Sequence, residues 1–236
     1  MFRILIADFV VEIHNRYNFL KKLCTDYIYE GERPSDFVIC VTDAEIEEER
    51  RNSESIFTNY YTESVCAYRK LCLKLPEYGA FLVHGSTVSY KDKGIIFLAR
   101  SGVGKTTHTL AWKNVYGDDV LIINGDKPIV RFIDGEPFAY GTPWAGKEKM
   151  QFNSKVKLTD ICFIERDSDN STVKINSSER LNSFMQQILP PNDPLQAIKT
   201  LELVDKLVGN CNNWLIKCTP TEQAAIVAHD AICNDH

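Results

Sequence analysis

A stretch near the middle of the chain combines glycine, lysine and threonine in a pattern suited to phosphate binding. It reads Ser101, Gly102, Val103, Gly104, Lys105, Thr106 and Thr107, after the apolar run GIIFLAR and before a helix-like pattern. Glycines let the backbone approach an anion closely, and the N–H groups before a helix surround phosphate oxygens. Lys105 adds a mobile positive charge, and the Thr106 hydroxyl is a ligand for Mg²⁺. We therefore predict that these residues bind the phosphates of ATP together with Mg²⁺.

This stretch departs from the P-loop pattern GxxxxGK[ST] at one position. Ala99 stands where the first glycine belongs. That position mainly ends the strand, so a small alanine fits there. The alternative is a tight turn between a strand and a helix that binds no nucleotide. The positions that contact phosphate and metal are all present, and this favours nucleotide binding.

A single carboxylate follows the next apolar strand along the chain. The sequence Asn124-Gly125-Asp126 comes directly after the strand expected at 119–123. An acid at the carboxyl end of a neighbouring strand is where P-loop enzymes hold magnesium. We predict that Asp126 is a metal ligand and a catalytic residue. The alternative is an ordinary turn, for which these three residue types are also well suited.

Other candidate residues flank this pair of motifs. His84, which lies before Gly85 and ahead of the loop, is a candidate catalytic residue or a structural histidine. Lys147 and Glu148 lie in the irregular segment GTPWAGKEKM and are candidate contacts for substrate or phosphate. A surface turn with a packed tryptophan is the competing account of that segment. His108 is expected to be structural or solvent-facing.

Hydrophobic periodicity predicts the elements that must position these residues. The expected strands are two within 2–14, then 36–42, a hairpin of 80–90 with 94–100, 119–123, 128–133, 137–140, 156–164 and 213–217. The expected helices are 16–28, 43–56 with Asp43 as its N-cap, 62–75, 105–113, 178–189 before a Pro-Pro break, 194–208, and one from residue 221. Strands and helices alternate without an internal repeat, which predicts an α/β fold.

Composition narrows the class of protein. The 236 residues have a net charge of −5, and this argues against nucleic acid as the main partner. No run of about 18 apolar residues and no cleavable leader is evident, so neither membrane insertion nor export is expected. The eight cysteines form no CxxC pair, and several, such as Cys40 and Cys162, lie in apolar runs. We predict buried thiols in a reducing, cytoplasmic environment.

The order of these motifs resembles the HPr kinase/phosphorylase family, which shares a P-loop fold with the phosphoenolpyruvate carboxykinases. The resemblance rests on the motifs HG, SGVGKTT, NGDKPIV, GTPW and IER and covers roughly residues 79–190. His84 matches the family's histidine before the loop, and Ser101 to Thr106 match the loop itself. Gly125-Asp126 matches the family's acidic pair, of which one acid is present here. The resemblance implies ATP, Mg²⁺ and a serine hydroxyl on a small protein as acceptor.

Taken together, these features predict an α/β protein with a P-loop-containing mixed sheet of the HPr kinase/carboxykinase type and flanking helices. Residues 1–78 are expected to be an N-terminal α/β extension packed on a kinase core of residues 79–236. The expected function is ATP- and Mg²⁺-dependent phosphorylation of a hydroxyl on a small molecule, peptide or protein. The alternatives are a nucleotide-binding regulatory module with little turnover and a carboxykinase-like enzyme. A homo-oligomer is expected by analogy with the family.

Overall fold

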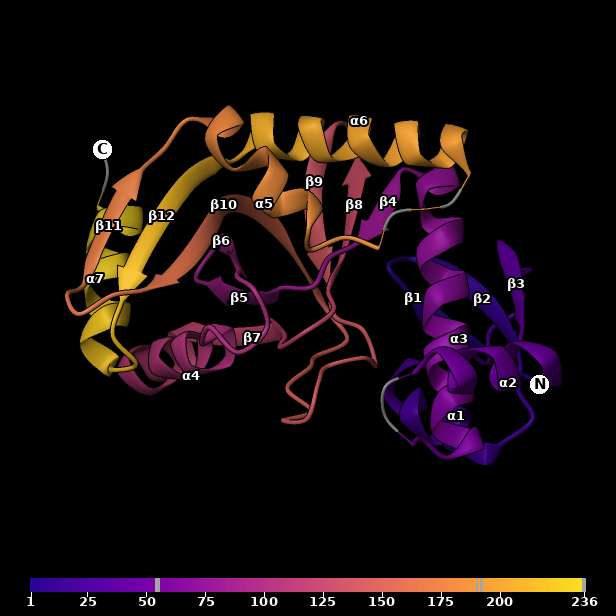
Figure 1. Ribbon diagram of the computed structural model, residues 1–236. Helices are drawn as coiled ribbons and strands as arrows, with labels where there is room; N and C mark the ends of the chain where they lie inside the picture. The colour runs from indigo at the N-terminus through magenta and orange to yellow at the C-terminus, as the bar shows by residue number, and fades with distance from the viewer. Residues whose placement is uncertain (54–55, 190, 192, 235–236) are drawn as a thin grey trace.

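One long strand organises the larger of two sheets. The computed structural model describes residues 1–53, 56–189, 191 and 193–234. Strand β10 (Lys155–Arg166) pairs antiparallel with β9 (Glu136–Tyr140) at its start, and parallel with β6 (Lys93–Leu98) and β12 (Asn212–Cys218) further along. Because one strand has three partners along its length, the sheet curls around it (Figure 1).

The remaining strands extend this sheet in both directions. The order is β4-β8-β9-β10-β6-β5-β7, with β12 on β10 and β11 on β12. Their bounds are β4 (Ala80–Leu82), β5 (Ser86–Tyr90), β7 (Val120–Asn124), β8 (Ile129–Ile133) and β11 (Ser171–Lys174). Parallel and antiparallel pairs both occur, so the expectation of a mixed α/β sheet is confirmed.

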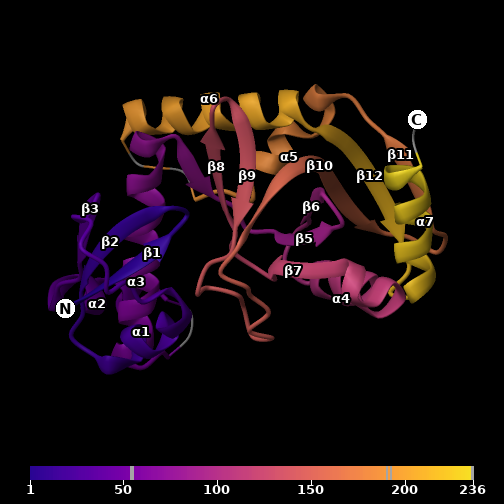
Figure 2. The ribbon, with the colours of Figure 1, turned by 180° about the vertical axis from the view of Figure 1, so that it is seen from behind.

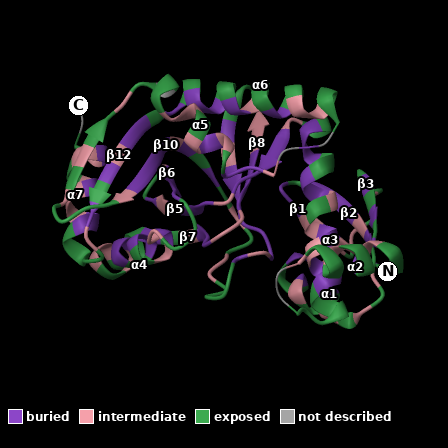
Figure 3. Cartoon of the chain, in the orientation of Figure 1, coloured by how far each residue is buried: buried purple, intermediate pink, exposed green. Residues whose placement is uncertain are grey.

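Helices cover both faces of this sheet because its central strands are apolar on both sides. Helices α4 (Lys105–Tyr116) and α7 (Glu222–Cys233) lie on one face, and α5 (Leu181–Met185) and α6 (Pro194–Asn210) lie on the other (Figure 2). Along β6, Ile95 and Phe97 pack towards Trp112 of α4, whereas Ile96 and Leu98 pack towards Phe184 of α5. This two-residue alternation divides the buried residues of the larger sheet (purple in Figure 3) between two apolar clusters.

A second, three-stranded sheet forms the N-terminal part. Its strands are β1 (Phe2–Ile6), β2 (Phe9–His14) and β3 (Phe37–Cys40), and its helices are α1 (Asn18–Leu23), α2 (Asp43–Asn52) and α3 (Asn59–Lys74). Its apolar cluster continues into the larger sheet through Leu82, Ile129 and Tyr140. Arg131 also donates to the carbonyl oxygen of Ala7 (2.6 Å). The division at residue 78 stays a prediction.

Several expected elements differ in extent. The helix expected at 16–28 is shorter, because it ends at Leu23 and a 3₁₀ turn (Thr25–Tyr27) follows. The N-cap of α2 is Thr42 rather than Asp43, since Thr42 and Glu45 form a capping box. That helix ends at Asn52, and residues 54 and 55 of its expected range lie outside the described residues.

Further along the chain, one expected strand and one expected helix differ from the structure, and one strand was missed. Residues 80–90 are two strands and not one: β5 forms the expected hairpin with β6, whereas β4 pairs with β8. The expected helix 178–189 reduces to a 3₁₀ turn (Ser177–Arg180) and α5, and residue 190 of the Pro-Pro break lies outside the described residues. The short, polar β11 had no apolar signal and was missed.

The cysteines are free thiols, and most of them are buried as expected. Cys40 is an exception: it is exposed, because β3 lies at the edge of its sheet and turns alternate residues to solvent. Within the described part of the chain, no helix is both long and apolar enough to cross a membrane.

The packing of α5 leads to a prediction about stability. Phe184 is completely buried, with its ring 6.4 Å from that of Phe81 and 6.5 Å from that of Phe163, between centroids. Phe184→Ala should lower the free energy of unfolding in urea by about 3–5 kcal/mol. The exposed Phe152 offers a control, and Phe152→Ala should change it by less than about 0.5 kcal/mol. Equal effects would show that α5 does not pack as described.

Candidate functional site

The loop between β6 and α4 has a backbone that requires glycine. We call residues 99–104 the glycine loop. Gly102 and Gly104 have φ values of +79° and +128°, a region that side chains disfavour. No atom lies within 4 Å of a Cβ added at either position, so the constraint is the backbone conformation and not lack of space. Residues with side chains at these positions would strain the loop.

The first turn of α4 is open to an anion. The N-cap residue of α4 is Gly104, which has no side chain. The first N–H groups of the helix therefore have no side-chain hydrogen-bond acceptor. Lys105 is buried, and its Nζ donates to the carbonyl oxygen of Ala99 (2.8 Å). Burial lowers the pKa of Lys105, although the charge of Asp126 opposes this shift. An ammonium group thus lies beside N–H groups at the positive end of a helix.

Arg166 holds the glycine loop from the neighbouring strand. Its guanidinium donates to the carbonyl oxygens of Val103 (2.9 Å, from Nε) and Gly102. Arg166 is the last residue of β10, which runs parallel to β6, so both strands end at the same edge of the sheet. These bonds engage two carbonyl oxygens of the loop and connect it to the end of β10.

A fully buried amide fixes the turn that follows β7. The Oδ1 atom of Asn124 accepts from the backbone N–H groups of Asp126 (2.9 Å) and Lys127 (2.6 Å). Its Nδ2 donates to the carbonyl oxygen of Thr142 (2.9 Å) and to the Thr142 hydroxyl (3.1 Å). The Thr142 hydroxyl in turn donates to the carbonyl oxygen of Lys127 (2.7 Å). This network fixes the backbone of the turn that carries Asp126.

Asp126 lies among three cationic or hydrogen-bonding side chains. Its Oδ1 is 3.3 Å from Nε2 of His84, and its Oδ2 is 3.8 Å from Nζ of Lys127. The backbone joins the same groups, because the N–H of Gly85 donates to the carbonyl oxygen of Asp126 (3.0 Å). Burial alone would raise the pKa of Asp126, but the hydrogen bond with His84 and the charges of Lys127 and Lys105 outweigh burial and lower it. Asp126 is therefore held as a carboxylate.

The irregular segment 141–150 closes the other side of the site. A Cβ on Gly146 would lie 3.1 Å from the Cβ of Asp126, so this segment runs directly against the acidic turn. Trp144 anchors it by donating from Nε1 to the carbonyl oxygen of Ser64 in α3 (3.2 Å). Lys147 and Glu148 are both exposed at its rim.

One cavity collects nearly all the predicted site residues. This loop cavity has a volume of about 530 Å³. Its lining includes His84, Ser101, Gly102, Gly104, Lys105, Thr106, Thr107, Asp126, Lys147 and Glu148. Of the predicted residues, Val103 alone is absent from this lining, and it faces two neighbouring cavities instead. The structure thus brings together residues that are up to 64 positions apart (84 to 148).

Sequence reasoning missed two cations of this cavity. Lys127 and Arg166 both line it. Lys127 follows Asp126 directly in the sequence, and this position could have identified it as a site residue. Burial lowers the pKa of its ammonium group, and the charge of Asp126 opposes this shift. No sequence pattern around Arg166 indicated a functional role, because an arginine at the end of a strand is common. Among the described residues, no group of three or more His, Cys, Asp or Glu side chains is arranged to hold a metal ion.

Comparison with known proteins finds a weak structural similarity and no match in sequence. No protein-family model and no curated protein matches the sequence. Among solved structures, the chain is similar to the Hpr(Ser) kinase/phosphatase from Coxiella burnetii, with a TM-score of 0.30 and 10% identity. The match covers 53% of this chain and 90% of that one. At these values the similarity carries no argument about fold or function.

The environment of Asp126 predicts how stability depends on pH. Its folded pKa lies below the ordinary value of 3.8, so its contribution to stability is present above that value and is lost as the pH falls through the folded pKa. Asp126→Asn should therefore lower the free energy of unfolding at pH values above about 5. The difference from the wild type should shrink below pH 3.8.

Urea denaturation at a series of pH values measures this difference. Glu148→Gln, which removes an exposed carboxylate from the rim of the same cavity, controls for the loss of one negative charge. A difference for Asp126→Asn that grows as the pH falls would contradict the described environment.

Proposed function

We propose that this chain is a phosphotransferase that binds ATP with Mg²⁺ in the loop cavity and phosphorylates a hydroxyl group. The observation that carries the proposal is the shared cavity of the glycine loop, Lys105, Asp126 and His84. Phosphoryl transfer needs little covalent chemistry from the protein and depends on positioning and charge stabilisation. The loop cavity offers groups for both tasks.

The start of α4 fits a triphosphate. Its uncapped N–H groups and the helix dipole favour negative charge, and the glycine loop lets phosphate oxygens approach the backbone. Lys105 would leave the carbonyl oxygen of Ala99 and donate to the β- and γ-phosphates instead. Thr107 and Ser101 are both exposed on the lining of the cavity and add hydroxyl donors.

The donor set also fits a magnesium ion that shares its ligands with the nucleotide. Thr106 and Asp126 line the cavity and supply one hydroxyl and one carboxylate oxygen. Mg²⁺ commonly takes one or two protein carboxylates and fills its other positions with phosphate oxygens and water. When bound, Mg²⁺ neutralises phosphate charge as the transferred group leaves. The low pKa of Asp126 keeps that carboxylate ionised at neutral pH.

His84 and Asp126 together suit the acceptor hydroxyl. A carboxylate that orients a hydroxyl and accepts its proton is the usual base in phosphoryl transfer to alcohols. His84 is held by its backbone N–H, which donates to the carbonyl oxygen of Gln187 (2.7 Å), and its ring lies beside Asp126. One oxygen of Asp126 can then remain with His84 while the other, which lies 3.8 Å from Nζ of Lys127, serves the acceptor hydroxyl. The acceptor is a small molecule, a peptide or a protein.

Replacement of the loop lysine tests the proposal directly. Lys105→Ala should lower phosphoryl transfer on the order of 10²–10³-fold, because it removes a charged donor aimed at the transferred group. The protein is incubated with ATP, Mg²⁺ and a pool of hydroxyl-bearing metabolites and peptides. Mass spectrometry then follows gains of one phosphoryl group.

The matched control removes a lysine on the opposite face of the sheet. Lys199 is exposed on α6, away from α4 and the glycine loop, and Lys199→Ala should transfer at the wild-type rate (Figure 1). If Lys105→Ala remains folded and also transfers at that rate, the loop does not act on phosphate as proposed.

A second substitution separates an enzyme from a regulatory nucleotide-binding module. That alternative has one observation in its favour, since Asp126 is the single acid of its turn and is already paired with His84 and Lys127. In an enzyme, Asp126→Asn should lower turnover on the order of 10²-fold or more and leave ATP bound in the glycine loop. Calorimetric titration with ATP and the phosphoryl-transfer assay measure the two effects. Unchanged turnover in this variant would favour the regulatory module.

A further inference from the structure

A second cavity adjoins the loop cavity on the side of α7. This Pro220 cavity, of about 370 Å³, is lined by Thr107 and His108 of α4, by Arg166, and by residues 218–221 between β12 and α7. Its volume lies within the range of about 300–1,000 Å³ that is usual for small-molecule sites. Gly104, Thr107 and Arg166 line both cavities, so the two cavities lie side by side around these residues.

Parallel strands place the walls of the Pro220 cavity at one edge of the sheet. Strands β6, β10 and β12 run parallel and neighbour one another, with Leu98 opposite Phe163 and Arg166 opposite Cys218. The segments after these three strands therefore come together, and ligands of open α/β sheets bind at such an edge. The turn after β12 is fixed, because Oδ1 of Asn170 accepts from both the N–H (2.8 Å) and the hydroxyl (3.1 Å) of Thr219.

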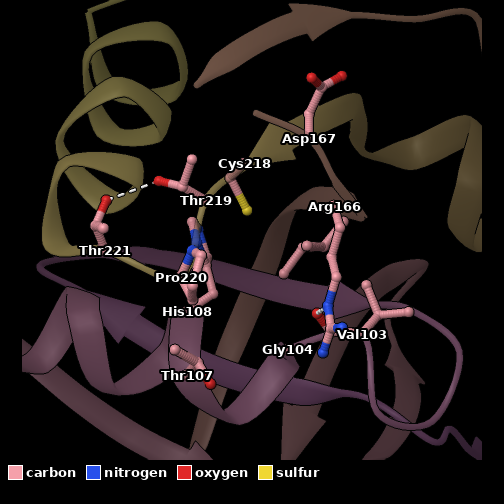
Figure 4. Close-up of a pocket in the computed structure, with 11 residues that line it drawn as sticks. Val103, Gly104, Thr107, His108, Arg166, Asp167, Cys218, Thr219, Pro220 and Thr221 are labelled. Atoms are coloured by element: carbon pink, nitrogen blue, oxygen red, sulfur yellow. Dashed lines mark hydrogen bonds between the residues drawn. The ribbon is translucent and has the colours of Figure 1, made fainter. Parts of the chain in front are cut away.

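The two sides of the cavity suit a flat aromatic ring. Figure 4 shows Arg166 and Val103 on one side and Pro220 and His108 on the other, with Cys218 between them. A guanidinium group stacks on aromatic planes, and Arg166 is held in place by its bonds to the glycine loop. The ring of Pro220 and the side chains of Val103 and Cys218 offer apolar surface to the faces of a ring.

His108 adds a buried donor that has no partner. The indole N–H of Trp112, which can only donate, lies 3.1 Å from Nε2 of His108, so Nε2 accepts. Burial lowers the pKa of His108 to about 4, so the ring is neutral at pH 7 and carries its hydrogen on Nδ1. Nδ1 is enclosed and has no hydrogen-bond partner among the described residues. The hydrogen bond with Trp112 agrees with the expectation that His108 is structural. The alternative expectation, that His108 faces solvent, is wrong because the residue is buried.

We propose that the Pro220 cavity holds the planar base of the nucleotide, and that His108 donates from Nδ1 to a ring nitrogen or carbonyl oxygen of that base. This inference rests on the proposed function, because the phosphates of the same nucleotide occupy the loop cavity. It adds a specificity site from the C-terminal part of the chain, residues 218–221, where no motif in the sequence pointed to a ligand. Thr107, at the junction of the two cavities, lies where the α-phosphate and ribose would pass.

Comparison of two ligands distinguishes the contribution of the base to binding from that of the phosphates. Binding of ATP and of inorganic tripolyphosphate, each with Mg²⁺, is measured by calorimetric titration of the full chain. The wild type should bind ATP at least about tenfold more tightly, because tripolyphosphate reaches only the loop cavity. Lys105→Ala should weaken both ligands. If both ligands bind the wild type with equal affinity, the base site is overturned and the proposed phosphate site stands.

Two substitutions locate the base within the cavity. His108→Gln keeps an acceptor for Trp112 and removes the donor at the position of Nδ1, and it should weaken ATP about 3–10-fold while tripolyphosphate binding is unchanged. Pro220→Ala removes one face of the cavity and should have an effect of the same sign. Thermal unfolding of each variant verifies that it is folded.

Other outcomes overturn the inference in distinguishable ways. Wild-type affinity for ATP in both folded variants would overturn the assignment of the base to this cavity. Equal loss of affinity for ATP and tripolyphosphate in His108→Gln would show a general effect on α4 and not recognition of a base. If neither ligand binds the folded wild type, the proposed function fails and this inference fails with it.

Discussion

The arrangement of the site depends on the buried amide of Asn124. An amide has one acceptor oxygen and one donor nitrogen, and here the oxygen accepts two backbone N–H groups while the nitrogen donates to Thr142. A carboxylate could not donate, and an apolar side chain would leave buried N–H groups unpaired. Since the Thr142 hydroxyl also bonds to the carbonyl oxygen of Lys127, the acidic turn and the segment from residue 141 form one rigid unit. Polar networks of this kind specify structure because every member is satisfied.

A second constraint, the parallel pairing of three strands, brings the other groups to that unit. Strand β10 is shared by the two parts of the larger sheet, so it aligns the end of β6 with its own end and with the end of β12. The glycine loop, Arg166 and the turn at residues 218–221 are consequences of where these strands end. The hydrogen bonds from Arg166 to the glycine loop then connect residues 63 and 64 positions apart in the chain.

The sequence predicts those parts of the site that are contained in short contiguous patterns. Gly102, Gly104 and Lys105 need only a strand before them and a helix after them, and local periodicity finds both. Arg166 and Thr142 carry no such signal, because their roles arise from strand pairing and from a buried contact with a distant amide. The same limit explains the errors in the fold.

Burial of edge strands and short helices is decided by neighbours that the sequence does not reveal. The apolar run around Cys40 suggests a buried strand, yet β3 has one partner strand and exposes alternate residues. The helix expected at 178–189 has the right apolar spacing, but the backbone beyond α5 turns so that Ile188 bridges to Val83 of the larger sheet. In both places tertiary contacts override local preference.

Charge provides an independent argument that the loop cavity suits an anion. The chain as a whole has a net charge of −5, so an average patch of its surface is acidic. The lining of the loop cavity has the opposite balance, with four cations (Lys105, Lys127, Lys147 and Arg166) against two carboxylates (Asp126 and Glu148), an excess of two positive charges. Concentrating positive charge costs stability when nothing compensates it, and burial lowers the pKa of both Lys105 and Lys127. A bound polyanion would relieve that cost, and the uncapped start of α4 would favour its binding at the glycine loop.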